Sequence, residues 1–116
     1  MFHMSQNLKV VLAVQPVDLR KSFHGLYAVA VQRLKETPEK GALLVFGNRS
    51  HNRVEVLCFD GTGCWVCTKR LEKGTFSWPK SGTVRQEKMR LRPESLSLLL
   101  DGVDLRGAAL RPWYQR

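Results

Sequence analysis

Three short apolar runs joined by polar turns constrain the fold of this chain more than any other feature. They are residues 42–46 (ALLVF), 54–59 (VEVLCF) and 64–69 (CWVCTK). Short runs rich in β-branched and aromatic residues, separated by turns that carry Gly, Asn and Asp, are typical of β-hairpins. We therefore predict three antiparallel strands in a meander. A fourth short strand is expected at residues 75–78, ending at Pro79, because proline cannot donate to a strand ladder.

A strand and a helix are expected before the meander. Residues 9–14 (KVVLAV) form a short β-branched run that stops before Pro16, as a buried strand would. Asp18 is a favourable N-cap, and apolar residues recur every three to four positions from 19 to 34, the spacing of one helix face. The helix should end before Thr37-Pro38, because the residue before proline is pushed out of the α region.

A second, short helix is expected near the C-terminus. Pro93 suits its first turn, its inner face carries leucines, and Gly102 suits the position just past its end. Residues 80–88 are polar and are expected to be mobile. The predicted fold is a single α+β domain over residues 1–116, with a core at about 8–105 and flexible termini. It has an antiparallel meander of three to four strands, one long helix packed on the sheet and a short C-terminal helix, and the place of the first strand in the sheet is left open.

The charge of the chain points to an acidic partner. Its 116 residues include 19 Lys and Arg against 10 Asp and Glu, a net charge of +9. So basic a domain favours nucleic acid first and an acidic protein second. No apolar run approaches the roughly 18 residues of a membrane span, and none near the start suits a signal peptide. Three cysteines without an export signal argue against a disulfide framework, so we expect a soluble, cytoplasmic protein with no membrane contact.

The motif Cys64-x-x-Cys67 is the first candidate for chemistry. A zinc site needs four ligands, and the chain has no second CxxC or HxxxH. If residues 64–69 form a strand, the two side chains point to opposite faces and cannot chelate one ion. We therefore expect structural cysteines, with no metal and no cofactor.

A nuclease-like set of acids and histidines is the second candidate. Metal-dependent phosphoryl chemistry requires two or three carboxylates converging on divalent ions. Each acid has a simpler explanation: Asp60 precedes glycine in a turn, Asp18 caps a helix, and Glu55 faces solvent on an alternating strand. With His24 and His51 as the only other members, the set does not predict catalysis, and no catalytic residue is expected.

Basic residues in two places are the third candidate. Lys69, Arg70 and Lys73 lie in KRLEKGTFSWPK (69–80), and Arg49 and Arg53 lie in the loop across the meander. Cations on one side of a sheet could follow phosphates, and the interleaved aromatics at 76 and 78 could stack on bases, although core packing explains the aromatics more simply.

Arg20 and Lys21 pose a question of their own. Cations in the first turn of a helix are unfavourable, because the helix N-terminus is itself partly positive. Fixed beside free N–H groups they would form a phosphate-binding corner, and the planar fork of Arg20 suits the specific contact. The alternative is that Arg20 forms a salt bridge within the domain and Lys21 is solvated. The candidate anion-binding residues are thus Arg20, Lys21, Arg49, Arg53, Lys69, Arg70 and Lys73.

Three stretches resemble a known family in order and spacing. PVDLRKSFHGL (16–26), LLVFGNRSHNRVEVLCFDGTGCWVCTKRLEKGTFSWP (43–79) and LSLLLDGVD (96–104) are similar to the small accessory protein, sometimes called TnpB, of the sixty-six family of bacterial insertion sequences. The resemblance implies a protein encoded beside a larger DDE-type transposase and needed for efficient transposition. It brings no known active site with it.

Several positions depart from the family pattern. His24 stands where an acid is usual, and Cys64, Cys67 and Thr68 stand where aromatic or aliphatic residues are common, which supports a packing role for the cysteines. Thr75 and Ser77 replace residues that are often basic, leaving Lys69, Arg70 and Lys73 as the cations of that segment.

The sequence therefore predicts a non-catalytic accessory factor for DNA transposition. Its expected partners are DNA, with RNA as the alternative ligand, and the transposase of the same element. The competing hypothesis is a pure protein-interaction subunit. Its positive charge would complement an acidic surface of the transposase, and the protein would not contact DNA. Oligomeric state and sequence specificity are not predicted.

Overall fold

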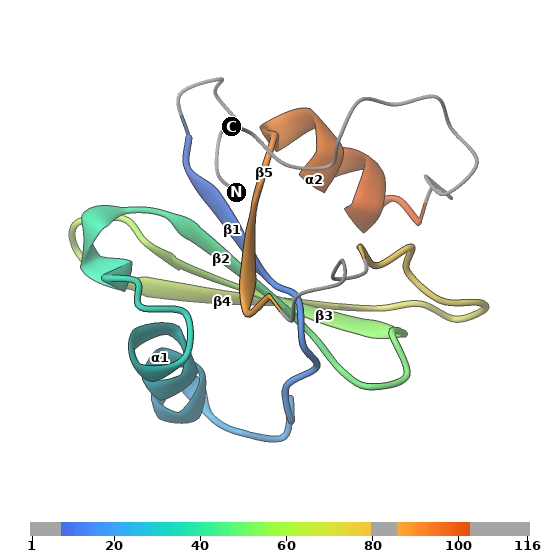
Figure 1. The fold of residues 1–116 in the computed structure, drawn as a ribbon, viewed down its shortest axis with the longest axis horizontal. Coiled ribbons are helices and arrows are strands. Elements are labelled where there is room, and N and C mark those ends of the chain that lie inside the picture. Colours follow the sequence, from blue (N-terminus) through green and yellow to red (C-terminus); the bar gives the residue numbers. More distant parts are fainter. Residues whose placement is uncertain (1–7, 80–85, 103–116) are drawn as a thin grey trace.

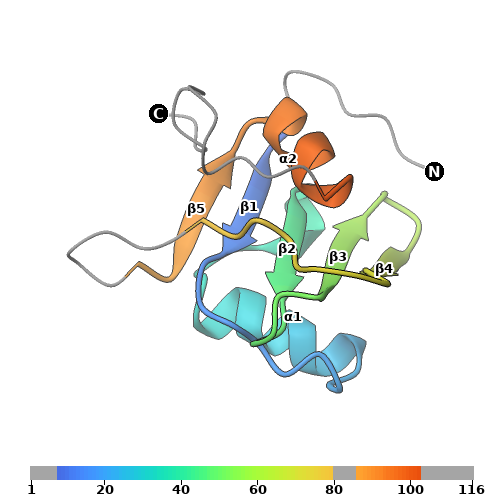
Figure 2. The ribbon, with the colours of Figure 1, turned by 90° about the vertical axis from the view of Figure 1, so that its right-hand side faces the viewer.

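A mixed five-stranded sheet organises the fold in the computed structural model of the chain, which describes residues 8–79 and 86–102. The strand order is β4-β3-β2-β1-β5, as Figure 2 shows. β1 pairs parallel with β2, with Val10 opposite Leu43, and all other neighbours are antiparallel. The strands are β1 (Val10–Ala13), β2 (Leu43–Gly47), β3 (Arg53–Phe59), β4 (Cys64–Arg70) and β5 (Lys88–Leu91).

Two helices cover opposite faces of the sheet. The parallel pair β1–β2 needs a crossover, and α1 (Phe23–Gln32) supplies it on one face, followed by a short 3-10 helix, η1 (Pro38–Lys40). α2 (Pro93–Leu100) packs on the other face (Figure 1). Because both faces are covered, every residue of β1 and β2 is buried. This explains why these two strands are continuously apolar rather than alternating.

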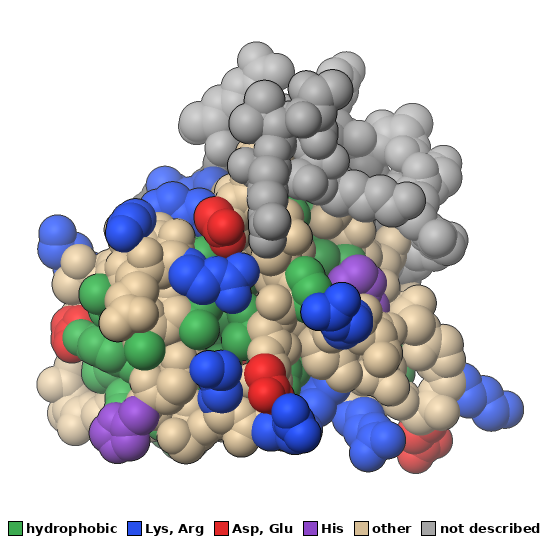
Figure 3. All heavy atoms as spheres, turned by 60° about the horizontal axis from the view of Figure 1, so that its bottom comes forward, with side chains coloured by type: hydrophobic (Ala, Val, Ile, Leu, Met, Phe, Trp, Pro, Cys, Tyr) green, Lys and Arg blue, Asp and Glu red, His purple; other side chains and the backbone are tan. Residues whose placement is uncertain are grey.

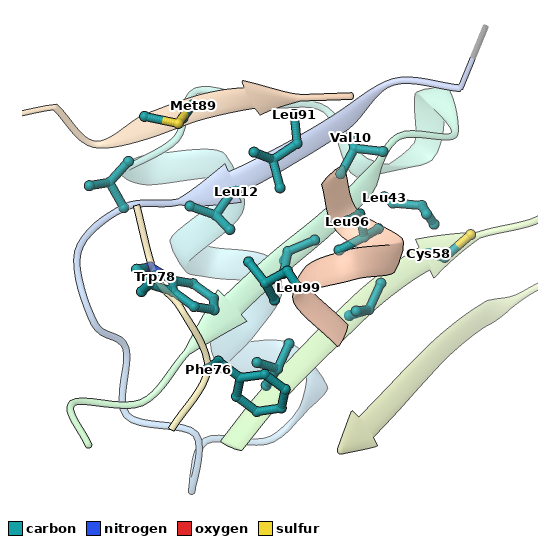
Figure 4. Packing of buried hydrophobic residues seen from close by; sticks show 14 residues of the cluster. Val10, Leu12, Leu43, Cys58, Phe76, Trp78, Met89, Leu91, Leu96 and Leu99 are labelled. Atoms are coloured by element: carbon teal, nitrogen blue, oxygen red, sulfur yellow. The ribbon is translucent and has the colours of Figure 1, made fainter. Parts of the chain in front are cut away.

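Each face of the sheet has its own hydrophobic cluster. On the α1 face, Leu26 and Ala30 of the helix are fully buried with Phe46 and Leu57 of the sheet. On the α2 face, Leu96 and Leu99 are fully buried, and Phe76 and Trp78 extend the cluster along the sheet (Figure 4). Among the described residues, no helix is long and apolar enough to cross a membrane.

The indole of Trp78 fixes one end of the α2-face cluster. Its Nε1–H donates to the carbonyl of Ala13 at 3.3 Å, and its ring stacks on His51 with centroids 5.6 Å apart. A Cβ on Gly47 would lie 2.8 Å from the indole carbon Cη2. Glycine at position 47 is therefore what lets the indole lie flat against β2.

The first helix begins later than the sequence predicts, and it is short. Asp18 is not its N-cap: the cap position is Ser22, and the helix has 10 residues. The backbone of Asp18 instead closes a turn, because the N–H of Lys21 donates to its carbonyl at 3.2 Å. The helix also ends well before Thr37-Pro38, because Lys35 takes a left-handed φ of 56° and the N–H of Glu36 bonds back to the carbonyl of Ala30.

The sheet also differs from the prediction. Residues 75–78 are not a strand, since Phe76 and Trp78 leave the sheet edge to pack across the α2 face. Lys88, the last residue of the segment expected to be mobile, and residues 89–91, for which no strand was predicted, form β5 against β1. The sheet is consequently mixed rather than an antiparallel meander of three to four strands. The rest of the mobile-segment prediction (80–85), the termini and the end of the expected core (103–105) lie outside the described residues.

The C-terminal helix forms where the sequence places it. α2 begins at Pro93 and its inner leucines are buried. Gly102 has a left-handed φ of 79° and donates its N–H to the carbonyl of Leu99 at 3.0 Å, as expected of a residue just past a helix end.

Candidate nucleic-acid interface

Two loops that are distant in the sequence meet at one end of the sheet. The loop from β1 to α1 is joined to β2 by a hydrogen bond from the N–H of Val17 to the carbonyl of Gly47, 2.9 Å long. Between this loop and the β2–β3 loop lies an open cavity of about 440 Å³. Nine residues line it: Pro16, Val17, Asp18, Leu19, Arg20, Asn48, Arg49, Ser50 and Arg53. Three of the predicted anion-binding arginines therefore surround one cavity.

Asp18 and Arg20 form a closed local unit in this cavity. Asp18 Oδ1 accepts the backbone N–H of Arg20 and its Nε–H, each at 3.0 Å, and Oδ2 accepts from Nη2 at 3.0 Å. These hydrogen bonds from Arg20 lower the pKa of Asp18 to about 2. The Arg20 side chain is 88% exposed. The structure thus shows the alternative weighed for Arg20, a salt bridge within the domain.

The side-chain stem of Lys21 passes close to Gly25 of α1. A Cβ on Gly25 would lie 2.6 Å from the Cβ of Lys21 and 3.1 Å from its Cγ and Cδ, so glycine is required for the lysine stem to cross the first turn of α1. The side chain is exposed, and it has no acidic partner among residues 8–79 and 86–102. The absence of a side chain at Gly25 therefore makes room for the stem of Lys21.

The two ends of the β2–β3 loop are joined by hydrogen bonds made by the side chain of Asn48. Its Oδ1 accepts the N–H groups of Asn52 and Arg53 at 3.1 and 3.2 Å, and its Nδ2 donates to Asn52 Oδ1 at 2.7 Å. His51 adopts a left-handed φ of 56° and stacks on Trp78. Burial lowers the pKa of His51. Arg49 lies exposed in this loop, and no local sequence pattern indicated that Asn48 would organise it.

Arg53 and Arg70 lie directly opposite each other on β3 and β4. Like charges in such cross-strand positions are destabilising. Arg53 Nη2 lies 3.5 Å from Glu55 Oε1, whereas Arg70 has no acidic partner in the described part of the chain. Because Arg53 also lines the cavity, Arg20, Arg49, Arg53 and Arg70 form one continuous group, which we call the arginine surface. Figure 3 shows Lys and Arg side chains spread over the α1 side of the molecule, with few acids among them.

Glu55 does not face solvent, contrary to the sequence prediction. It is 5% exposed, and besides Arg53 its Oε1 accepts a hydrogen bond from the Thr68 hydroxyl at 3.3 Å. Burial raises the pKa of Glu55, and Arg53 and Thr68 only partly oppose this. The Oε2 atom is buried and has no hydrogen-bond partner among the residues that the structure describes. Strand alternation alone missed this burial, because it depends on how Arg53 and Thr68 fold over the carboxylate.

The remaining cations do not all join the arginine surface. Lys69 lies opposite Val54, on the α2 face, and its Nζ donates to the carbonyl of Leu100 at 2.6 Å, next to the end of α2. Such a contact stabilises a helix C-terminus. Lys73 lies exposed in the loop after β4. The structure therefore separates Lys69 from Arg70, which the sequence grouped together.

The acids and histidines of the nuclease-like set are dispersed. Asp60 closes the β3–β4 turn by accepting the N–H groups of Thr62 and Gly63 and the indole N–H of Trp65. His24 contacts the ring of Phe23 on α1. Across the described residues, no three His, Cys, Asp or Glu side chains come close enough to hold a metal ion.

Cys64 and Cys67 lie on opposite faces of β4. Cys64 is opposite Phe59, which packs on the α1-face cluster, and Cys67 is opposite Val56, which belongs to the α2-face cluster. The parity argument from the sequence is thus confirmed, and the two sulfurs cannot chelate one ion. Phe76 and Trp78 are buried in the core, as the simpler explanation held, and they are not available to stack on bases. Within residues 8–79 and 86–102 the large aromatic side chain that is exposed is instead Trp65, at 49%.

The sequence of this chain is similar to those of known proteins. The sequence matches the family described as IS66 Orf2 like protein over residues 8–109. Two proteins of Sinorhizobium fredii (strain NBRC 101917 / NGR234) are similar to it. The uncharacterized protein y4jC is 35% identical over 100 residues, covering 86% of this chain and 83% of its own length. The uncharacterized protein y4hO is 37% identical over 101 residues, covering 87% and 85%. No solved structure matches.

Proposed function

The chain belongs to the IS66 Orf2 like family, a family associated with transposition, and we propose that it acts as a non-catalytic accessory factor for the DNA transposition of an insertion sequence. In this proposal it binds the nucleic-acid backbone through the arginine surface, in the cytoplasm, and works with the transposase of the same element. Bond cleavage and joining belong to the transposase.

The observation that carries the proposal is the convergence of arginines at one end of the sheet. Arg20, Arg49 and Arg53 come from two loops and a strand to line one cavity, and Arg70 faces Arg53 across the strand pair. Placing Arg53 and Arg70 opposite each other opposes folding. A phosphate between them would remove that repulsion, and guanidinium groups bind phosphate oxygens in bidentate geometry.

The shape of this surface favours backbone contact over base reading. The cavity is open and lies between two loops, and neither α1 nor α2 lines it as a recognition helix would. Contacts of this type are made to phosphates and carry little sequence information. The protein is therefore expected to bind nucleic acid with weak sequence preference.

A pull-down distinguishes this function from the competing one. The tagged protein is mixed with the transposase of its element, with and without nuclease treatment, and free DNA binding is measured separately at low salt. The proposal expects direct DNA binding, together with transposase capture. Capture that survives nuclease treatment, combined with no binding of DNA or RNA by the protein alone, would make it a pure protein-interaction subunit.

A further inference from the structure

β4 forms one edge of the described sheet, so its outer side has no neighbouring strand there. In the described part of the chain β4 pairs with β3 and with no other strand. It has seven residues, six of them exposed, and its register with β3 runs without a bulge. Soluble proteins usually protect such edges with proline, bulges, short length or central charges. The opposite edge, β5, is shorter, with four residues, and exposes Lys88 and Arg90, whereas both cations of the seven-residue β4 are at its C-terminal end.

The hydrogen bonds of the β3–β4 pair show which backbone groups are left over. The ladder is bracketed by bonds from the N–H of Asp60 to the carbonyl of Gly63 and from the N–H of Leu71 to the carbonyl of Asn52. Bonded and non-bonded pairs alternate along an antiparallel ladder. Trp65, Cys67 and Lys69 therefore bond to β3, while four residues direct their N–H and C=O groups outward: Cys64, Val66, Thr68 and Arg70.

The side chains of β4 are self-complementary when the strand is reversed. Both cations, Lys69 and Arg70, are at its C-terminal end, and the N-terminal end carries Trp65 and Val66, which are 49% and 40% exposed. A second β4 strand paired in parallel and in the same register would place the cations of the two copies beside each other. An antiparallel copy centred on residue 67 pairs all seven residues and sets each cationic end against an apolar one.

We propose that β4 binds the β4 strand of a second copy of this chain, antiparallel and centred on Cys67, to form a symmetric dimer with one continuous sheet. In that register Val66 of one copy and Thr68 of the other exchange backbone hydrogen bonds. This agrees with the outward direction of the N–H and C=O groups of both residues. Trp65 lies opposite Lys69 of the second copy, so the aliphatic stem of that lysine, whose Nζ donates to the carbonyl of Leu100, is placed to pack on the indole. Such an interface is isologous, as in most homodimers.

The dimer places the two arginine surfaces on one side. The two-fold axis of an antiparallel strand pair is perpendicular to the sheet, so the α1 faces of both copies point the same way. Arg70 lies at one end of β4 in each copy, so the two surfaces stand at opposite ends of the shared strand pair. The dimer itself does not depend on what the arginine surface binds.

Mass measurement tests the dimer. Analytical ultracentrifugation of the full chain should give twice 13.3 kDa. Val66→Pro removes one outward N–H and no bond to β3, and Val66→Lys places a charge in the middle of the edge, so both should halve the mass. Val31→Lys is the matched control, because Val31 on α1 is 39% exposed and distant from β4 in the chain; it should leave the mass unchanged. Circular dichroism checks that each variant is folded.

Disulfide trapping tests the register. Non-hydrogen-bonded antiparallel partners have Cα atoms about 4.5 Å apart, within the range of a disulfide. Diamide, which is reduced as two thiols are oxidised, should therefore link Cys67 to Cys67 of the second copy. Cys64→Ser should leave the linked dimer intact and Cys67→Ser should abolish it. A monomeric wild-type chain, a dimer that survives both Val66 variants, or linkage through Cys64 would each overturn the proposal. The proposal would also be overturned if the chain were a monomer that binds the transposase through the outer edge of β4.

Discussion

Arg49 and Arg70 are the two members of the arginine surface with no acidic partner among the described residues, and replacing both with glutamine tests whether this surface binds DNA. Arg20 is already bonded to Asp18, and Arg53 lies 3.5 Å from Glu55. The glutamine variants keep most of the side-chain stem and remove only charge. The double variant thus avoids exposing a buried acid or breaking a local turn.

The expected loss of affinity follows from counterion release. Each phosphate neutralised contributes about 0.9 to the slope of log affinity against log salt for B-DNA, so two lost contacts flatten the slope by up to about 1.8. With the same affinity extrapolated to 1 M salt, this corresponds to about sixtyfold weaker binding at 0.1 M, and to only about threefold at 0.5 M. Fluorescence anisotropy with a labelled duplex over a salt series measures both quantities.

Stability should change little in this variant. Both side chains are exposed, and exposed charges contribute under about 1 kcal/mol to folding. Removing the Arg70 charge also relieves its repulsion with Arg53. Urea denaturation of the variant should therefore match the wild type, which separates loss of binding from loss of fold.

A second double variant with the same charge change supplies the control. Lys40→Gln with Arg90→Gln removes two exposed cations, one in η1 and one in β5, that do not line the cavity. If binding depends on the arginine surface, this control retains the wild-type slope. Equal slopes for the two double variants would show that only net charge matters, and the reasoning from the arginine surface would then be refuted.

Two further predictions concern the fold that supports this surface. Gly47→Ala should lower the free energy of unfolding, measured by urea titration, by about 1 to 3 kcal/mol, because the new Cβ would lie 2.8 Å from the Trp78 indole. Gly63→Ala is the control. A Cβ at Gly63 meets no atom within 4 Å, so this variant should change the free energy of unfolding by less than about 0.5 kcal/mol. Glu36→Gln should cost about 1 to 2 kcal/mol at pH 7, because the carboxylate accepts from Lys9 at 2.9 Å and Lys88 at 2.5 Å. Burial raises the pKa of Glu36, but the bonds from Lys88 and Lys9 outweigh it and hold that pKa below its ordinary value of 4.5. The stabilisation is therefore present above about pH 4.5 and is lost as the pH falls through the folded-state pKa, so denaturation curves of wild type and variant should converge in acid; a difference that stays constant down to pH 3 would contradict this assignment.

Much of the secondary structure could be predicted because it depends on neighbours in the sequence. The runs at 42–46, 54–59 and 64–69 match β2, β3 and β4 closely, since short apolar runs between turn residues leave few other conformations. The opposite faces of Cys64 and Cys67 follow from the two-residue period of a strand. α2 and its terminal Gly102 follow from local backbone preferences. Membership of the family could also be inferred from motifs alone.

The candidate site depended on contacts that no local pattern encodes. Asp18 had two competing uses, a helix cap and a bond to Arg20, and the rest of the loop selected the second. Lys69 and Arg70 are adjacent in the sequence but lie on opposite faces, where one meets the end of α2 and the other faces Arg53. The burial of Glu55 likewise depends on two side chains that close over it.

The sequence by itself determined the strands β1 to β4 and the helix α2, where the charge lies and which family the chain belongs to. Tertiary structure alone decided that β1 lies between β2 and β5, parallel to one and antiparallel to the other, and that Arg20 joins Arg49 and Arg53 around one cavity. The physical reason is range. Backbone propensity and side-chain period act over a few residues, whereas strand order and the meeting of distant loops are set by burying two apolar faces at once, which is a property of the whole chain.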